Sequence, residues 1–200
     1  MNNEKPTMIP SVFDDEQELL KNLLSIHCPD GIELDPMCFK GNFYKEIEMP
    51  KLMFDINPVL DGCVWADAQN LPVESSSISC MILDPPFLFE IRNRINNNYS
   101  VNTHGIMKGF DGLETLYKGI LSEANRVLVN KGTLIFKCQD FTDSKTTMTH
   151  CYVWKWAEEL GFYAKDLAIL HLPKNKIWNS KLTQRHMRKV HSYFWVFKTT

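Results

Sequence analysis

The stretch that decides the fold is Ile78-Ser79-Cys80-Met81-Ile82-Leu83-Asp84-Pro85-Pro86-Phe87. Its first six residues form a short, mostly apolar run, which is typical of a strand buried on both faces of a parallel sheet. The two prolines after Asp84 restrict the backbone to extended geometry, so the strand leaves the sheet through a stiff exit. The stretch therefore predicts a buried strand that ends in a carboxylate, with an aromatic ring held just beyond it.

Three earlier apolar runs also end in an acidic residue. They cover residues 32–35, 52–55 and 62–67 and end in Asp35, Asp55 and Asp67. Because ligands of open parallel sheets bind outside the carboxyl ends of the strands, we expect these carboxylates and Asp84 to converge on one crevice. Asp55 stands about twenty residues after Asp35, where doubly wound proteins place the acid that binds a ribose diol. Asp67 is then placed to meet an adenine amino group.

The rest of the chain alternates helical and strand patterns. A helix is expected to begin after Asp14 or Asp15 and to end near Pro29-Asp30-Gly31. The further predicted elements are helices at 113–128 and 150–160 and strands at 133–138, 166–172 and 192–198, the last two forming a closing hairpin. Lys137, Gln139, Asp140 and Asp143 end or follow the first of these strands and are candidates for the same crevice.

This order predicts a single α/β domain over residues 1–200. Within it we expect a loosely ordered lead-in at residues 1–13, a long substrate loop at 88–112 and a basic loop at 174–191.

Composition narrows the class of protein. The 200 residues are 44% hydrophobic, which is enough for one hydrophobic core. The formal net charge is -2, so the chain lacks the basic excess of a protein that coats nucleic acid. No apolar run is long enough to span a membrane, and the N-terminus lacks the pattern of a signal peptide. The six cysteines stand singly, without a Cys-x-x-Cys pair, so we expect reduced thiols, no metal site and a cytoplasmic location.

The Asp84-Pro85-Pro86-Phe87 box has the chemistry of an amine clamp. The exocyclic nitrogen of a base is a poor nucleophile because its lone pair is delocalised into the ring. The Asp84 carboxylate and the Pro85 carbonyl would accept its two N–H groups and draw it toward tetrahedral geometry, while Phe87 would stack on a base swung out of its helix. A sulfonium methyl donor needs no metal, because the protein mainly supplies orientation and hydrogen bonds. A rigid turn with a core aromatic is the plainer interpretation.

Leu83-Asp84-Pro85-Pro86-Phe87 resembles motif IV of the DNA amino-methyltransferases, in which such a box is associated mostly with adenine N6 methylation. Leu34-Asp35-Pro36 with Gly41 resembles a degenerate motif I that has a single glycine, and Phe54-Asp55 and Ala66-Asp67 resemble motifs II and III. The chain is also similar to small phage and prophage DNA methylases that carry a Lys-Gly-x-Phe-Tyr segment, here residues 40–44.

The resemblance implies a Rossmann-like class I methyltransferase with a doubly wound, mostly parallel seven-stranded sheet and an antiparallel C-terminal hairpin. It implies S-adenosylmethionine as methyl donor and adenine N6 in DNA as acceptor, as in adenine-specific enzymes of restriction-modification systems. The residues implied for the cofactor are Asp35, Pro36, Phe39, Lys40, Gly41, Asp55, Ala66, Asp67 and Asp84. Cytosine N4, an RNA base, and a catalytically silent subunit of a methyltransferase complex stay open as alternatives.

Two polar segments are the expected contacts with nucleic acid. The segment 174–191 is basic and contains an aromatic residue, as phosphate contact requires, and the loop 88–112 borders the Asp84 box. The candidate contacts are Arg92, Arg94, His104, Lys176, Lys181, Arg185, Arg188 and Lys189. A solvated basic loop is the plainer interpretation of 174–191. Neither segment has the length of a target-recognition domain, so a monomer, a homodimer and a complex with a recognition subunit all stay open.

Overall fold

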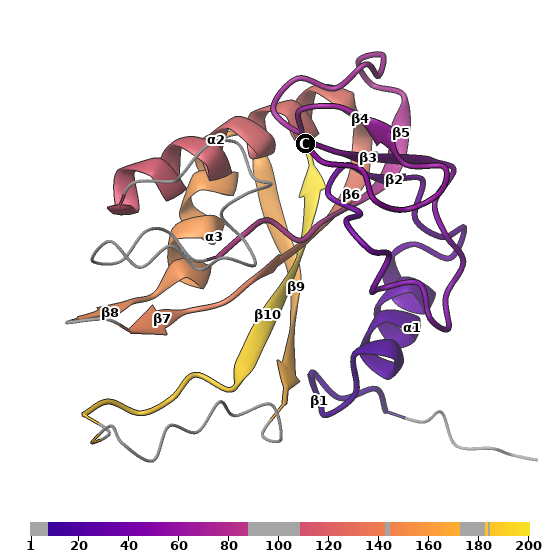
Figure 1. Cartoon of the computed structure of the whole chain (residues 1–200). Helices are drawn as coiled ribbons and strands as arrows, with labels where there is room; N and C mark the ends of the chain where they lie inside the picture. Colours follow the sequence, from indigo (N-terminus) through magenta and orange to yellow (C-terminus); the bar gives the residue numbers. More distant parts are fainter. Residues whose placement is uncertain (1–7, 88–108, 143–144, 173–182, 184) are drawn as a thin grey trace, which may run out of the picture.

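A computed structural model of the chain describes residues 8–87, 109–142, 145–172, 183 and 185–200 (Figure 1). Eight strands form one sheet in the order β1-β9-β10-β6-β5-β2-β3-β4. These strands are β1 (Val12–Phe13), β2 (Leu34–Asp35), β3 (Leu52–Asp55), β4 (Val64–Trp65), β5 (Ile78–Leu83), β6 (Leu128–Cys138), β9 (Phe162–His171) and β10 (His191–Thr199). A separate antiparallel ribbon consists of β7 (Phe141–Thr142) and β8 (Thr146–Thr147).

Parallel pairing brings the carboxyl ends of the central strands to one edge of the sheet. β2 pairs in parallel with β3 and β5, β3 with β4, and β5 with β6. β10 runs antiparallel to both β6 and β9, so β9 points the same way as β6. The predicted fold class, a mostly parallel sheet with an antiparallel C-terminal hairpin, is confirmed.

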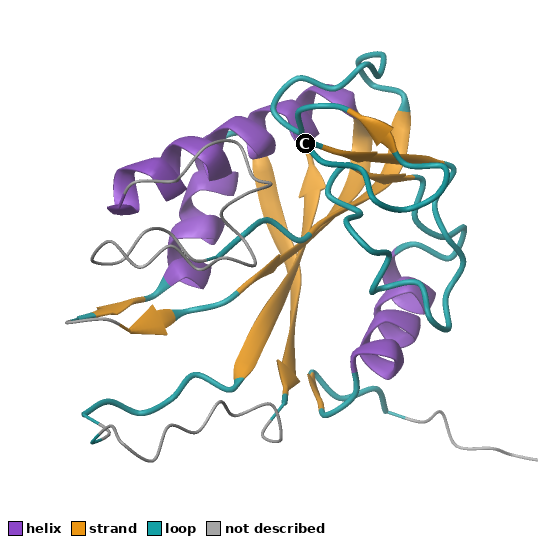
Figure 2. Cartoon of the chain, viewed as in Figure 1, coloured by secondary structure: helices purple, strands orange, loops and turns teal. Residues whose placement is uncertain are grey.

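Helices cover both faces of this sheet, as Figure 2 shows. They are α1 (Glu16–His27), α2 (Gly109–Val127) and α3 (Thr149–Glu159). α1 packs on one face, whereas α2 and α3 pack on the other, so the domain has two cores. None of the helices among the described residues combines the length and the apolar character that crossing a membrane requires.

The alternation along β5 follows from these two cores. Met81 and Leu83 lie in the core under α2 and α3, whereas Cys80 and Ile82 lie in the core under α1. All four side chains are buried, because successive residues of a strand point to opposite faces and both faces are covered. The mostly apolar run that predicted this strand is thus explained by two-sided burial.

The ends of the helices set the lengths of the neighbouring segments. The Asp15 carboxylate caps α1 as expected, accepting the backbone N–H groups of Gln17 at 2.8 Å and Glu18 at 2.9 Å. α2 begins at Gly109 instead of residue 113, so residues 109–112 of the predicted loop are helical. β9 begins at Phe162 instead of residue 166, directly after α3 has ended.

The prediction of a loose lead-in over residues 1–13 was wrong at its end. Val12 and Phe13 form β1, which pairs in parallel with Ile169 and Leu170 of β9 and makes the sheet eight-stranded instead of seven-stranded. Phe13 is buried in the core under α1, and this burial fixes the segment against the sheet.

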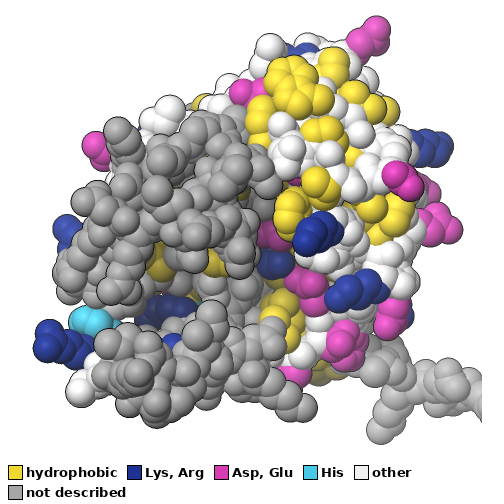
Figure 3. All heavy atoms as spheres, viewed as in Figure 1, with side chains coloured by type: hydrophobic (Ala, Val, Ile, Leu, Met, Phe, Trp, Pro, Cys, Tyr) yellow, Lys and Arg dark blue, Asp and Glu magenta, His cyan; other side chains and the backbone are white. Residues whose placement is uncertain are grey.

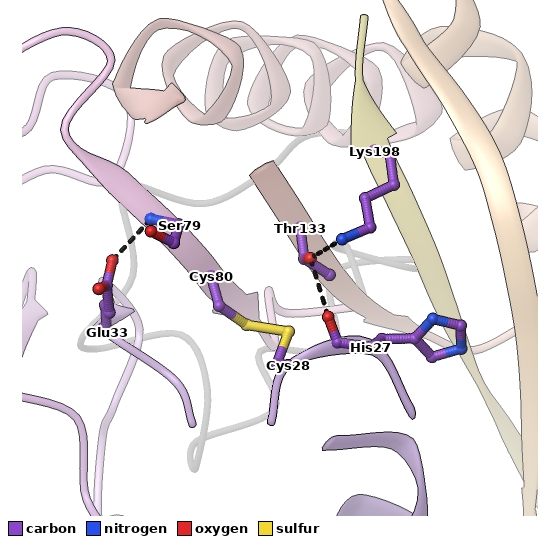
Figure 4. The surroundings of a disulfide bond; sticks show 7 residues. All are labelled: His27, Cys28, Glu33, Ser79, Cys80, Thr133 and Lys198. Carbon is purple, nitrogen blue, oxygen red and sulfur yellow. Dashed lines mark hydrogen bonds between the residues drawn. A yellow bond between two sulfur atoms is a disulfide. The ribbon is translucent and has the colours of Figure 1, made fainter. Parts of the chain in front are cut away.

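The prediction that all cysteines are reduced was also wrong. Cys28, which follows α1, forms a disulfide with Cys80 of β5 (Figure 4). The helix ends against the sheet, which brings the two Cα atoms to 6.4 Å, within the range a disulfide spans. Nearby, the Thr133 hydroxyl of β6 donates to the His27 carbonyl at 3.3 Å, a second link between the end of α1 and the sheet. The free cysteines are Cys38, Cys63, Cys138 and Cys151.

The sheet edge at β4 exposes apolar side chains. Leu52, Val64 and Trp65 are all exposed, and Figure 3 shows hydrophobic side chains gathered over this end of the sheet. β4 is only two residues long, and short edge strands limit pairing with other chains.

Titration of free thiols in the unfolded protein tests the disulfide. Without reductant we expect four reactive thiols, and after reduction all six. Because the bond joins residues 52 positions apart, reduction should lower the free energy of unfolding by about 4 kcal/mol, measured by urea unfolding with and without reductant. As a control, Cys63→Ser should leave that difference unchanged. Six reactive thiols without reductant would contradict the bond.

Candidate active site

Acidic side chains stand at the carboxyl ends of the parallel strands. Asp35 ends β2, Asp55 ends β3, Asp84 directly follows β5, and Asp67 lies two residues after β4. The negative charges of Asp55 and Asp84 both raise the pKa of Asp35, so these carboxylates lie within electrostatic reach of one another. We call the four residues the acid row.

Asp35 is the most deeply buried member of the row, at 2% exposure. The Tyr44 hydroxyl donates to its Oδ2 at 2.6 Å, and the Met37 N–H donates to its Oδ1 at 2.9 Å. Burial raises the pKa of Asp35 to about 7; the two hydrogen bonds oppose this rise and the neighbouring carboxylates add to it. A positive charge placed beside Asp35 would therefore be strongly stabilised.

The turn after β2 occupies the place of the glycine-rich motif. Phe39 (φ 42°) and Gly41 (φ 66°) both adopt left-handed backbone conformations, which are uncommon for a residue such as Phe39. The Phe39 N–H donates to Asp55 Oδ2 at 2.9 Å, which fastens the turn to the end of β3. The Lys40 ammonium lies 5.3 Å from the centre of the Phe39 ring. A Cβ on Gly41 would come within 3.1 Å of a Leu60 methyl carbon, so this glycine avoids a clash inside the protein.

The acids of β3 and β4 also bind the backbone. Asp55 Oδ1 and Asp67 Oδ1 each accept, at 2.8 Å, the N–H two residues further along the chain. Because a carboxylate has about four lone-pair sites, Asp55 retains acceptor capacity for a ligand. Pro36 and Ala66, two other predicted cofactor residues, are buried beside the row.

Asp84 is part of an ion pair that crosses the sheet. Lys137 of β6 donates to Asp84 Oδ2 at 3.2 Å and to Glu16 Oε1 of α1 at 2.8 Å. Burial raises the pKa of Asp84, Lys137 opposes this rise, and Glu16 adds to it. The Asp84 side chain keeps 32% exposure, and within the described residues its Oδ1 accepts no hydrogen bond. One carboxylate oxygen is thus open to a donor.

The rest of the box is held against α2. Pro85 is buried, whereas Pro86 and Phe87 are half-buried. The Tyr117 hydroxyl of α2 donates to the Pro86 carbonyl at 3.2 Å. The sequence analysis assigned the neighbouring carbonyl, that of Pro85, to the amine clamp. The bond to Pro86 therefore stiffens the strand exit without occupying the clamp carbonyl.

The end of β6 carries a separate polar network. Asp140, at 3% exposure, accepts hydrogen bonds from His150 Nδ1 at 2.7 Å and from the Tyr193 hydroxyl at 3.4 Å. It also accepts the His150 N–H at the start of α3, while Gln139 donates to the His191 carbonyl at 3.1 Å. These bonds join β6, α3 and β10, so the network holds these three elements together. Asp143, which was predicted to line the same crevice, lies outside the described residues. No cluster of His, Cys, Asp and Glu in the described part of the chain is arranged to hold a metal ion.

Part of the predicted nucleic-acid surface is described. Arg185 and Arg188 are exposed and Lys189 is half-buried, shortly before β10 begins. Because His191 pairs with His171 at the carboxyl end of β9, this segment lies at the sheet edge that also carries the acid row. The predicted contacts Arg92, Arg94, His104, Lys176 and Lys181 lie outside the described residues.

Two residues of the site escaped the sequence analysis. Tyr44 entered it only within the segment 40–44, and nothing in its spacing indicated the hydrogen bond to Asp35. Glu16 had the signature of a first-turn acid in α1, which concealed its contact with Lys137, 121 positions away. The partners of a Tyr or Glu side chain depend on which segments the fold brings together, and the spacing of residues in the sequence does not reveal those partners.

The strand order and the antiparallel C-terminal hairpin form a Rossmann-like fold of the kind found in class I methyltransferases. Solved structures share it. A chain from the complex between the Haloferax volcanii Trm112 methyltransferase activator and a candidate methyltransferase has a TM-score of 0.55 and 12% identity, covering 90% of this chain and 87% of that one. An S-adenosylmethionine-dependent methyltransferase from Methanosarcina mazei has a TM-score of 0.52 and 12% identity, covering 88% and 96%.

The chain spans about half the length of a candidate DNA modification methylase from Thermus thermophilus, solved with S-adenosylmethionine. That match has a TM-score of 0.47 and 15% identity and covers 66% of this chain and 53% of that one. No family model and no curated protein matches the chain.

The high pKa of Asp35 predicts a pH dependence of stability. Its folded-state pKa is about 7 and its ordinary value is 3.8, so between these values the folded protein binds the extra proton. The free energy of unfolding should therefore fall as the pH rises through this window, by a few kcal/mol from this group. Urea unfolding at about pH 5 and about pH 8 should show the wild type losing stability relative to Asp35→Asn. Parallel pH profiles for the two proteins would count against this protonation state.

Proposed function

We propose that this protein transfers the methyl group of S-adenosylmethionine to the exocyclic N6 amine of adenine in DNA. The observation that carries the proposal is the Asp84-Pro85-Pro86-Phe87 box at the carboxyl end of β5, beside the acid row. Lys137 binds one oxygen of the Asp84 carboxylate and leaves the other open. The methyltransferase fold supports the same class of reaction.

The acid row fits the charge of S-adenosylmethionine. This cofactor carries a sulfonium and an ammonium against one carboxylate, so its net charge is positive. Burial raises the pKa of Asp35, and the cofactor ammonium would supply a positive charge that stabilises its ionised form. Asp55 suits the ribose diol and Asp67 the adenine amino group. The other residues proposed to line the cofactor are Pro36, Phe39, Lys40, Gly41 and Ala66.

The residues of the box hold the acceptor amine. When bound, S-adenosylmethionine supplies an electrophilic methyl group on a sulfonium. Asp84 Oδ1 accepts one N–H of the amine and the Pro85 carbonyl accepts the other, which withdraws the lone pair from the ring. Phe87 stacks on the flipped base. Because Tyr117 fixes Pro86, the strand exit presents these acceptors with little freedom, which favours a reactive orientation.

The same clamp would accept the N4 amine of cytosine or a base in RNA, so the product analysis below decides the acceptor. We propose that the enzyme acts in the cytoplasm, as the sequence analysis predicts, and that it serves restriction-modification or its evasion, as its resemblance to phage and prophage enzymes implies. The proposal covers a monomer, a homodimer and a complex with a recognition subunit, and the Haloferax match comes from a complex with an activator.

Transfer of labelled methyl groups tests the reaction. Label from S-adenosylmethionine should appear in N6-methyladenine of DNA, and Asp84→Ala should reduce transfer by about 100-fold or more because it removes a transition-state acceptor. Asp30→Ala is the matched control, since Asp30 is exposed and precedes β2, at the opposite edge of the sheet. Label in N4-methylcytosine or RNA would move the acceptor to that base. Absence of transfer, with no calorimetric binding of the cofactor, would leave a silent subunit.

The basic segment predicts a salt dependence of DNA binding. Arg185→Gln and Lys189→Gln should each weaken binding for all sequences and reduce the slope of log affinity against log salt by about 0.9 per lost phosphate contact. Lys165→Gln removes an exposed charge near the other end of β9 and should leave the slope unchanged. Fluorescence anisotropy with a labelled duplex over a series of salt concentrations gives the slopes. Equal slopes in all four proteins would place the DNA elsewhere.

A further inference from the structure

A partly buried lysine contacts the proposed amine clamp. The Lys137 side chain is 15% exposed, and its ammonium bonds both Asp84 and Glu16. The same ammonium lies 4.7 Å from the centre of the Phe43 ring and 5.5 Å from that of Phe194. Two carboxylates and two aromatic faces therefore fix a positive charge at one place in the site.

We infer that Lys137 is a positioning residue for methyl transfer, which keeps Asp84 an ionised acceptor with its Oδ1 directed to the amine. The inference rests on the proposed function. An ionised carboxylate accepts hydrogen bonds at both oxygens, whereas a protonated carboxyl group donates from one of them. Since Lys137 takes Oδ2, Oδ1 is the atom left for the amine. A proton on Asp84 would remove an acceptor that the clamp needs.

The charged and titratable groups around Asp84 determine whether its pKa rises or falls. Among the described residues, the titratable groups that interact with it are Lys137 and Cys138 on β6, Glu16 on α1, Asp35 on β2 and Tyr117 on α2. Lys137 lowers the pKa of Asp84, whereas burial and Glu16 raise it. Burial would by itself lower the pKa of Lys137, but Asp84 and Glu16 raise it overall, so the lysine is charged at neutral pH.

Substitution of Glu16 distinguishes an electrostatic role of Lys137 from a role in packing alone. Removing the Lys137 charge leaves Asp84 partly buried without its cation, so its pKa rises. Removing the Glu16 charge deletes a repulsive carboxylate and frees Lys137 for Asp84 alone, so the pKa of Asp84 falls. A lysine that served packing alone would give no shifts of opposite sign.

The test compares the pH dependence of methyl transfer in the wild type, Lys137→Met, Lys137→Arg and Glu16→Gln. We expect the acid limb of activity to move up by about one pH unit or more in Lys137→Met and to move down in Glu16→Gln. Lys137→Arg retains the charge and should keep the acid limb close to that of the wild type. Shifts in the same direction for Lys137→Met and Glu16→Gln, or no shifts, would overturn the inference.

A second measurement separates this inference from the proposed function. The Asp84 carboxyl carbon is titrated by NMR in protein with ¹³C-labelled aspartate, and its signal is assigned with Asp84→Asn. The two substitutions could shift the Asp84 pKa in opposite directions although the wild-type protein methylates no nucleic acid. That result would uphold the role of Lys137 and reject the proposed function. An Asp84 pKa that ignores both substitutions would reject the role of Lys137 whatever the activity. If Lys137→Met does not fold, Glu16→Gln decides by its downward shift.

Discussion

Burial of β5 on both faces is the constraint on which the rest of the structure depends. Cys80 and Ile82 face the core under α1, and Met81 and Leu83 face the core under α2 and α3. A polar side chain along this strand would lose its hydration without gaining a partner. Beyond Cys80, the first position that escapes this cost is Asp84, at the carboxyl end. Its parallel neighbours end at the same edge, so the polar groups collect there.

Acids that lie together at one edge of the sheet repel one another, which makes each of them harder to ionise. Within the part of the chain that the structure describes, a cation compensates for this repulsion at Asp84 but not at Asp35. Asp84 has a cation, Lys137, in hydrogen-bond contact. Among the described residues, the hydrogen bonds to Asp35 come from neutral donors, the Tyr44 hydroxyl and the Met37 N–H, and its pKa lies at about 7. The row therefore has one end compensated by the protein itself and one end that gains most from a cationic ligand. This asymmetry agrees with the proposal that the cofactor binds near Asp35 and the acceptor amine near Asp84.

The sequence predicts those features that depend on local pattern. Apolar runs ending in acids located β2 to β5, and the cap of α1 was narrowed to Asp14 or Asp15, of which Asp15 is the one observed. Features that depend on the pairing of distant segments were missed. The Cys28–Cys80 disulfide spans 52 positions, and β1 had no apolar run of its own to predict its pairing with β9. Periodicity indicates that a face is buried, but only the fold determines which residues cover it.

The single glycine after β2 illustrates how a fold replaces a missing motif. A glycine-rich turn reaches left-handed conformations at little cost, whereas Phe39 pays for its positive φ with strain. The hydrogen bond from its N–H to Asp55 offsets that strain and fixes the turn on the next strand. Asp55 thus anchors the turn after β2 while also standing at the position proposed for the ribose diol. The proposed binding of the ribose would then be coupled to the shape of the turn through one carboxylate, a coupling that a glycine-rich turn does not require.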